Sequence, residues 1–169
     1  MQLTRDARAR NVHAMRIALF EPDIAGNVGT ILRLCACLDI PVDIIEPCGF
    51  PMGDRALRRA GMDYAQRALV SRHDDWTAYR GRSRDKRLVL LTTKAADRYT
   101  DFAFERDDVL LLGRESGGVP ESVHDAVAAR ISIPMAPGLR SLNVAVAAAM
   151  VVGEALRQTN GFSHQGQNS

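Results

Sequence analysis

Three short segments gather the polar and glycine residues of this chain that have the chemistry to bind a ligand. Residues 21–33 read EPDIAGNVGTILR, residues 112–120 read LGRESGGVP, and residues 133–143 read IPMAPGLRSLN. Each segment follows an apolar run and leads into a stretch with helical periodicity. Glycine at such turns lets the backbone approach a ligand, whose recognition then falls to amide and carbonyl groups. The three segments therefore predict a binding site built from loops.

The common signatures of several other enzyme classes are absent. No G-x-G-x-x-G follows the first apolar run, no G-x-x-x-x-G-K-[ST] occurs, and no G-x-S-x-G is found. These absences disfavour an ordinary dinucleotide-binding fold, a P-loop nucleotidase and a serine-nucleophile elbow. The C-x-C pair Cys35 and Cys37 has no second Cys or His cluster to complete a tetrahedral site, so we expect no metal.

The elements that must position these segments alternate between strand and helix. Strands of mainly apolar residues such as LVLL at 88–91 are typical of parallel strands covered on both faces. The predicted fold class is therefore α/β, a mostly parallel sheet with helices on both faces. We expect one domain over residues 15–161, with residues 1–14 and 162–169 disordered. The predicted strands are 17–20, 42–45, 88–91, 109–112 and 131–133, and the predicted helices are 27–38, 54–60, 74–79, 119–129 and 141–158.

Charge is unevenly distributed along the chain, although its total is small. The formal net charge is +2, yet residues 54–98 carry twelve basic and six acidic side chains. Arg55, Arg58 and Arg59 share one face of the helix predicted there, and they are candidates to contact phosphate groups. A solvated arginine-rich face explains the same pattern equally well. His73 lies in this stretch and is expected at the surface.

The hydropathy pattern predicts no membrane association. The most apolar run, residues 144–153, is too short to cross a bilayer. Residues 1–13 are polar and arginine-rich, and they lack the apolar core of a signal peptide. Three cysteines cannot all pair with one another, so we expect a reducing compartment, and the cytoplasm is the predicted location.

Taken in order, the three segments resemble the motifs of the SPOUT superfamily of RNA ribose methyltransferases. The runs IEP at 45–47 and LRRAGMDY at 57–64 narrow the resemblance to its tRNA wobble-nucleotide 2′-O-methyltransferases, over about residues 15–161. The resemblance implies methyl transfer from S-adenosyl-L-methionine (AdoMet), without a metal, to the ribose 2′-hydroxyl of the wobble cytidine or uridine in the tRNA anticodon loop. It also implies a C-terminal deep trefoil knot, and a homodimer formed through the knot region and the last helix.

The same resemblance assigns catalytic roles to Arg33, Asn27 and Glu115. Arg33 would approach the target ribose and help to remove the hydroxyl proton, or it is simply a surface ion-pair residue. A free arginine is a poor base because its pKa lies above about 12. Asn27 either bonds backbone around the pocket or caps the helix that follows it. Glu115 either orients Arg33 or the amino group of AdoMet, or is an ordinary loop carboxylate.

Six further residues match family positions that contact AdoMet: Leu91, Gly113, Gly118, Ile133, Ser141 and Leu142. Leu91 and Ile133 serve equally well as core residues, and Ser141 and Asn143 are also placed to cap the last helix. One departure from the family pattern is Ala145, where relatives often carry serine, so no hydroxyl role is assigned there. The same resemblance implies that Arg55, Arg58 and Arg59 contact phosphate groups of RNA.

Three other functions stay open on these residues. A related SPOUT enzyme that methylates another tRNA or rRNA ribose would carry the same motifs, although such relatives usually have an added RNA-binding domain. A non-catalytic RNA-binding relative would be expected to lack residues of the Arg33 or Gly113 type, and both are present. A small-molecule methyltransferase would turn over AdoMet without RNA.

Overall fold

The sheet at the centre of the molecule is parallel throughout. A computed structural model describes residues 15–51 and 68–162. Its strands lie in the order β3-β2-β1-β5-β4-β6, and each neighbouring pair is parallel. The strands are β1 (Arg16–Phe20), β2 (Val42–Ile45), β3 (Val70–His73), β4 (Leu88–Leu91), β5 (Val109–Leu112) and β6 (Ala129–Ile131). The helices described are α1 (Ala25–Leu38), α3 (Trp76–Arg82), α4 (Glu121–Ala126) and α5 (Val144–Gln158).

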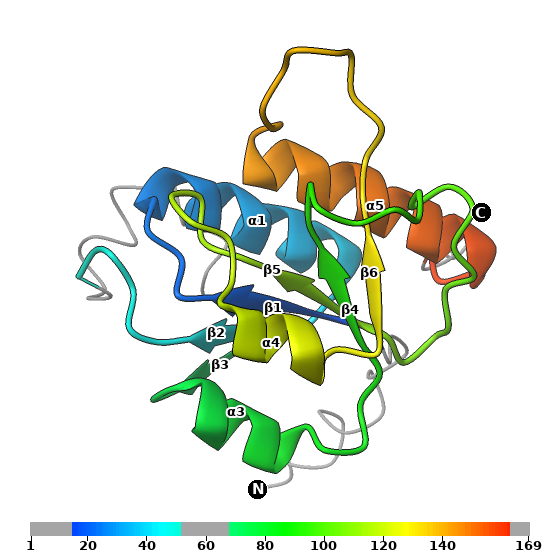
Figure 1. The fold of residues 1–169 in the computed structure, drawn as a ribbon. Helices are drawn as coiled ribbons and strands as arrows, with labels where there is room; N and C mark the ends of the chain where they lie inside the picture. Colours follow the sequence, from blue (N-terminus) through cyan, green and yellow to red (C-terminus); the bar gives the residue numbers. More distant parts are fainter. Residues whose placement is uncertain (1–14, 52–67, 163–169) are drawn as a thin grey trace, which may run out of the picture.

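Helices cover both faces of this sheet. In Figure 1, α1 and α5 lie on one face, and α3 and α4 lie on the other. Successive side chains of a strand point to opposite faces. Ile17 and Leu19 of β1 therefore enter the core beneath α1 and α5, whereas Ala18 and Phe20 enter the core beneath α3 and α4. The predicted class, a mostly parallel α/β sheet with helices on both faces, is confirmed.

The two helices on the first face pack against each other. α1 buries Val28, Ile31, Leu32 and Cys35, which have the i, i+3, i+4, i+7 spacing of one helical stripe. The facing stripe of α5 is mostly alanine and valine, so its short side chains allow close packing. α1 ends where Asp39 takes a left-handed conformation (φ 57°) and its N–H bonds back to the carbonyl oxygen of Cys35.

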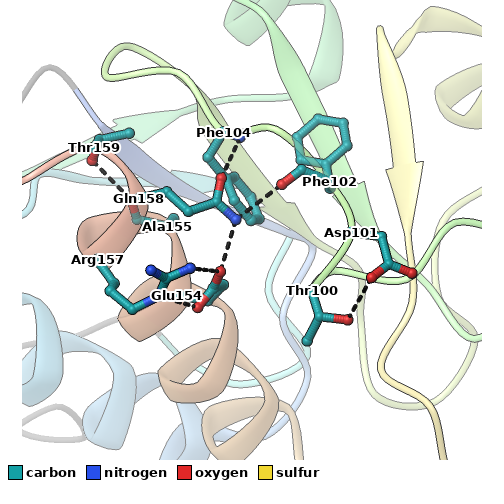
Figure 2. A network of polar contacts seen from close by, with 9 residues as sticks. All are labelled: Thr100, Asp101, Phe102, Phe104, Glu154, Ala155, Arg157, Gln158 and Thr159. Carbon is teal, nitrogen blue, oxygen red and sulfur yellow. Dashed lines mark hydrogen bonds and ion pairs between the residues drawn. The ribbon is translucent and has the colours of Figure 1, made fainter.

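The C-terminal end of α5 is bonded to the segment that precedes β5 (Figure 2). The Gln158 side chain accepts from the N–H of Phe104 at 3.0 Å and donates to the carbonyl oxygen of Phe102 at 3.0 Å. It also donates to Glu154 at 2.8 Å, and Glu154 forms an ion pair with Arg157 at 2.8 Å. The last helix is therefore held at its end as well as along its length.

The sequence pattern does not predict the edge strand β3, because Val70 is the one apolar residue of its four, VSRH; three of the four are exposed in the structure. His73 of this strand is only 6% exposed, so its predicted surface position is wrong. Its Nε2 lies 2.9 Å from Oδ1 of Asp43. The two carboxylate oxygens of Asp43 also accept one hydrogen bond each from the Arg16 guanidinium. A buried carboxylate needs such partners, and this contact links β1, β2 and β3.

The starting points of α1 and α5 differ from the predictions. α1 begins at Ala25, so Asn27 lies in its first turn and does not cap it. α5 begins at Val144, three residues later than predicted, because the Asn143 side chain accepts the first free N–H groups of the helix. Of the two residues considered as its cap, Asn143 has that role and Ser141 does not.

The middle helices also differ in extent. The helix predicted at 119–129 is limited to α4 because β6 begins at Ala129, two residues before the predicted strand. The helix predicted at 74–79 is α3, which starts after its cap Asp75 and runs to Arg82. The predictions for residues 1–14, 54–60 and 163–169 lie outside the described residues. No helix in the described segments is long and apolar enough to span a bilayer.

Candidate functional site

A cavity of about 400 Å³ opens at the carboxyl ends of β4 and β5. This volume is within the range of small-molecule pockets in proteins. Its walls come from the segments that follow β4, β5 and β6, and the first turns of α1 and α5 complete it. Among the residues described, no group of three or more His, Cys, Asp or Glu side chains is placed to hold a metal ion.

The strand order explains why the cavity lies there. β2 and β3 lie on one side of β1, whereas β5, β4 and β6 lie on the other side. The connections that leave β1 and β5 therefore diverge, and open α/β sheets bind ligands in the crevice formed at such a point. Asn27, at the start of α1, and Glu115, in the loop after β5, meet across this crevice.

The loop after β5 is folded so tightly that two of its positions require glycine. Arg114 and Gly118 exchange two backbone hydrogen bonds, of 3.2 and 2.8 Å. A Cβ on Gly113 would lie 2.8 Å from the carbonyl carbon of Gly118, and Gly118 has a φ of 66°. The Arg114 guanidinium is held by an ion pair with Glu21 at 2.8 Å. These contacts fix the backbone that forms one wall of the cavity.

Side chains from all three motifs form one directional hydrogen-bonded chain beside the cavity. Nδ2 of Asn143 donates to Oδ1 of Asn27 at 2.9 Å, and Nδ2 of Asn27 donates to Oε1 of Glu115 at 2.9 Å. Because a carboxylate oxygen only accepts, Asn27 must turn its nitrogen to Glu115 and its oxygen to Asn143. The oxygen of Asn143 is then left to accept from the N–H groups of Ala145 and Val146, and it caps α5.

A second carboxyl group, Asp23, lies next to Glu115. The contact with Glu115, with added hydrogen bonds from the N–H groups of Glu115 and Ser116, lowers the pKa of Asp23 to about 2. The pKa of Glu115 is raised, mainly by burial of the carboxyl group and to a smaller extent by its contact with Asp23. Two adjacent carboxyl groups resist carrying two charges together. As the pH falls, the first proton is therefore taken up by Glu115, and Asp23 stays ionised.

Eight residues predicted from the sequence line the cavity. They come from all three motifs and from the end of β4: Asn27, Leu91, Gly113, Glu115, Gly118, Ile133, Ser141 and Leu142. Asn27 fits neither predicted role, since its amide bonds two side chains rather than backbone. Glu115 is held by Asn27 and by the backbone N–H of Asp23.

Arg33 is not among the residues that line the cavity. It is exposed on α1, six residues after Asn27 and hence about 9 Å further along the helix and turned to another side. Arg55, Arg58 and Arg59, the predicted phosphate contacts, lie outside the described residues.

The predicted site residues do not include Thr92 and Thr93, which follow β4 and line the cavity. Polar residues directly after a buried parallel strand lie at its carboxyl end, where ligands bind, so a signal was available. Asp23 was also missed, although it lies within the first motif. Its bonding partners are about 92 residues away along the chain, and no local pattern marks that contact.

The known proteins that this chain resembles are methyltransferases. Residues 14–153 match the SpoU rRNA Methylase family. A tRNA (cytidine(34)-2′-O)-methyltransferase of Beijerinckia indica is 58% identical over 149 residues, which are 87% of this chain and 93% of that protein. A solved structure described as "Structural insights into the 2-OH methylation of C/U34 on tRNA" has 34% identity and a TM-score of 0.82, covering 89% of this chain and 99% of that one. The SpoU methyltransferase AviRb from Streptomyces viridochromogenes, in complex with the cofactor AdoMet, has 25% identity and a TM-score of 0.73, covering 86% of this chain and 61% of that one.

Substitution of Asn143 separates its two hydrogen-bonding roles. Asn143→Ala removes both the cap of α5 and the donor to Asn27, and should lower the free energy of unfolding by about 1–2 kcal/mol. Asn143→Ser keeps an oxygen that can cap but is too short to reach Asn27, so its loss should be about half as large. Urea denaturation of both variants measures this. Equal losses would contradict the cap, and an unchanged Ser variant would contradict a contribution from the bond to Asn27.

Proposed function

This chain belongs to the SpoU rRNA Methylase family, and on that premise we propose that it transfers a methyl group from AdoMet to the ribose 2′-hydroxyl of the wobble nucleotide of tRNA. The observation that carries the proposal is the convergence of the three motifs on one cavity at the carboxyl ends of β4 and β5. The relative with 58% identity, a tRNA (cytidine(34)-2′-O)-methyltransferase, supports the choice of acceptor.

The cavity fits AdoMet in size and in chemistry. Leu91, Ile133 and Leu142 supply apolar walls suited to an adenine ring, while the backbone of the loop after β5 offers donors and acceptors to its edges. Because Gly113 has no Cβ, the backbone of this loop can stay closed against Gly118. Glu115 lines the cavity as a carboxylate able to bind an ammonium group. When bound, AdoMet supplies a methyl group that its positively charged sulfur has already activated.

The residues of the protein then have to align the acceptor oxygen with this methyl group and to let the hydroxyl proton leave. The transfer forms an oxygen–carbon bond and breaks a sulfur–carbon bond, whose electron pair returns to sulfur. We assign Arg33 to the acceptor side of the site. Its guanidinium stays charged, so it orients the hydroxyl and favours loss of the proton electrostatically rather than acting as a free base.

Arg33 does not line the cavity of its own chain. A role for Arg33 in methyl transfer therefore requires a second chain, in which it would act at the partner's cavity. A surface suited to a second copy lies beside the cavity. Ile24, Leu142, Val146 and Met150 are 39–51% exposed, and the first two also line the cavity. Large exposed apolar side chains that gather in one area indicate an interaction surface. We therefore infer a homodimer through α5 and the segment before it, with each Arg33 at the partner's site.

We also infer that residues 15–161 form one domain with a knotted C-terminal part. β6 lies at the edge of the sheet, whereas α5 packs on α1 and β5, so residues 132–143 must cross the sheet. The end of α5 is bonded to residues 102 and 104, in the long connection between β4 and β5. A knot of this kind requires the chain end to pass through an earlier loop, and these bonds place α5 beside such a connection; knots of this kind are rare.

The proposed acceptor is the anticodon loop of a tRNA in the cytoplasm. Arg55, Arg58 and Arg59 would contact its phosphates, a role supported by the i, i+3, i+4 spacing that these residues have in the sequence. Another tRNA or rRNA ribose is the alternative acceptor, and the position of the transferred methyl group distinguishes the two.

The first test incubates the purified protein with labelled AdoMet and tRNA from a strain that lacks this enzyme, and maps the label after nuclease digestion. We expect a 2′-O-methyl group at nucleotide 34. Arg33→Ala should lower kcat at least about 100-fold, a typical effect of removing a group that acts in proton transfer, while AdoMet binding stays unchanged. Label at another ribose would move the acceptor, and a protein that does not bind AdoMet would disprove the methyltransferase proposal.

The glycine pair in the loop after β5 allows a matched test of the AdoMet pocket. Gly113→Ala places a methyl group 2.8 Å from the backbone of Gly118, so the loop must open and AdoMet affinity should fall at least about tenfold. Gly117→Ala adds the same methyl group to the same loop, where its nearest neighbour is 3.9 Å away, and should bind AdoMet normally. Calorimetric titration measures both. Equal affinity of the two variants would show that this loop does not form the AdoMet site.

The proposed dimer can be tested by placing a charge on its surface. Val146→Glu should dissociate the dimer, because an unpaired carboxylate is costly to bury in an apolar interface. Ala78→Glu places the same charge at an exposed position of α3, on the opposite face of the sheet, and should leave the dimer intact. Sedimentation equilibrium gives the mass of each. A Val146→Glu variant that remains dimeric would exclude this surface as the interface.

A further inference from the structure

Asp23 exchanges hydrogen bonds in both directions with the loop after β5. Its two carboxylate oxygens accept from the N–H groups of Glu115, at 3.0 Å, and Ser116, at 3.2 Å. Its own N–H donates to Oε2 of Glu115 at 3.2 Å. Just before it, Glu21 takes a left-handed conformation (φ 43°), which turns the chain after β1 toward this loop. Three bonds thus join the connection after β1 to the cavity wall formed by Glu115.

The position of Asp23 is also fixed from behind. A Cβ built on Gly49 would lie 2.6 Å from Cβ and 2.8 Å from Cα of Asp23, so the two residues are in direct contact. The N–H of Gly49 donates to the carbonyl oxygen of Pro22 at 3.0 Å. Asp23 therefore contacts the segment after β2 as well as the loop after β5.

We propose that Asp23 is a positioning residue for the AdoMet site, which holds the backbone of residues 115 and 116 and aims the Glu115 carboxylate into the cavity. Glu115 lines the cavity and Asp23 does not, so Asp23 acts through Glu115. Its effect on methyl transfer rests on the proposed function, whereas its effect on AdoMet binding does not.

The charge on Asp23 adds a second consequence to this geometry. Asp23 is ionised throughout the neutral range, and its negative charge opposes ionisation of Glu115. The other charged groups on these segments, within the described residues, are Arg114 and Glu21, which pair with each other at 2.8 Å, and Glu46, which pairs with Arg72 at 2.7 Å. The contacts from α1 and α5 are the neutral amides of Asn27 and Asn143. Asp23→Asn removes the opposing charge, so the pKa of Glu115 should fall.

The expected pH dependence of AdoMet binding follows from the direction of this pKa change. If ionised Glu115 is the form that binds AdoMet, wild-type binding weakens as the pH falls through the raised pKa of Glu115. In Asp23→Asn the same loss should occur at lower pH, although binding near neutrality is weaker because one N–H acceptor is lost. A residue that only supports the fold would weaken binding without moving this acidic limb.

The experiment compares six forms of the protein: wild type, Asp23→Ala, Asp23→Asn, Asp23→Glu, Gly49→Ala and the control Asp101→Ala. AdoMet affinity is measured by calorimetry between pH 4.5 and 8 (roughly the range in which carboxyl and imidazole groups titrate), and kcat and KM are measured with tRNA. Asp23→Ala should weaken AdoMet binding and lower kcat by roughly 10- to 100-fold, with tRNA KM within about twofold, as misplaced active-site groups do. Asp23→Glu should recover part of this loss.

Gly49→Ala pushes on Asp23 from a position outside the cavity and should give a smaller defect of the same kind. Asp101→Ala, an exposed aspartate near Thr100 (Figure 2), is the matched control and should behave as wild type. Normal AdoMet binding in a folded Asp23→Ala protein would overturn the proposal, as would an unmoved acidic limb in Asp23→Asn. If the wild type binds AdoMet but does not methylate tRNA, the proposed function fails while the binding data still decide the role of Asp23.

Discussion

Glu115 accepts hydrogen bonds on both of its carboxylate oxygens, and this constraint sets the orientation of the two asparagine amides linked to it. Asn27 must present its nitrogen, and Asn143 must then present its own nitrogen to the oxygen of Asn27. The same choice leaves the Asn143 oxygen free to cap α5. Hydrogen bonds that begin at this carboxylate therefore join the loop after β5 to the start of α1, and the start of α1 to the start of α5. Asn27 and Glu115 are 88 residues apart in the sequence, and Asn27 and Asn143 are 116 residues apart.

The last helix shows how such contacts make a scaffold from small side chains. Alanines bury little surface, so the packing of α5 on α1 needs fixed ends to be well defined. Asn143 supplies one fixed end, and Gln158 supplies the other by bonding the backbone of Phe102 and Phe104 (Figure 2). The outer side of the helix keeps the larger residues Val146 and Met150 exposed. A helix arranged in this way can serve the core on one side and a second chain on the other.

Local patterns in the sequence were sufficient for those parts of the fold whose physics is local. The apolar strands β1, β4 and β5 and the stripe of α1 follow from burial on both sides of a sheet or on one side of a helix. β3 and the burial of His73 were not predictable in this way, because they depend on pairing with β2 and on Asp43. In the site, the resemblance carried by the motifs identified eight of the residues that line the cavity. The bond from Asp23 to Glu115 is a contact between distant segments and left no periodic signal.

This chain lacks a glycine-rich dinucleotide loop, and its cavity is built in a different way. A Rossmann-type site takes its phosphate-binding groups from a single turn between a strand and its helix. Here the walls come from three connections and from the first turns of α1 and α5, which the bond from Asn143 to Asn27 joins. Detachment of α5 from its docked position on α1 would remove the wall that Val144 and Ala147 form. A ligand that binds only the docked state stabilises it by RT ln(1 + [L]/Kd), or about 2.7 kcal/mol at a hundred times Kd. Because α5 supplies both a wall of the cavity and the exposed side chains of Val146 and Met150, ligand binding and association with a second chain should both favour the docked position of this helix.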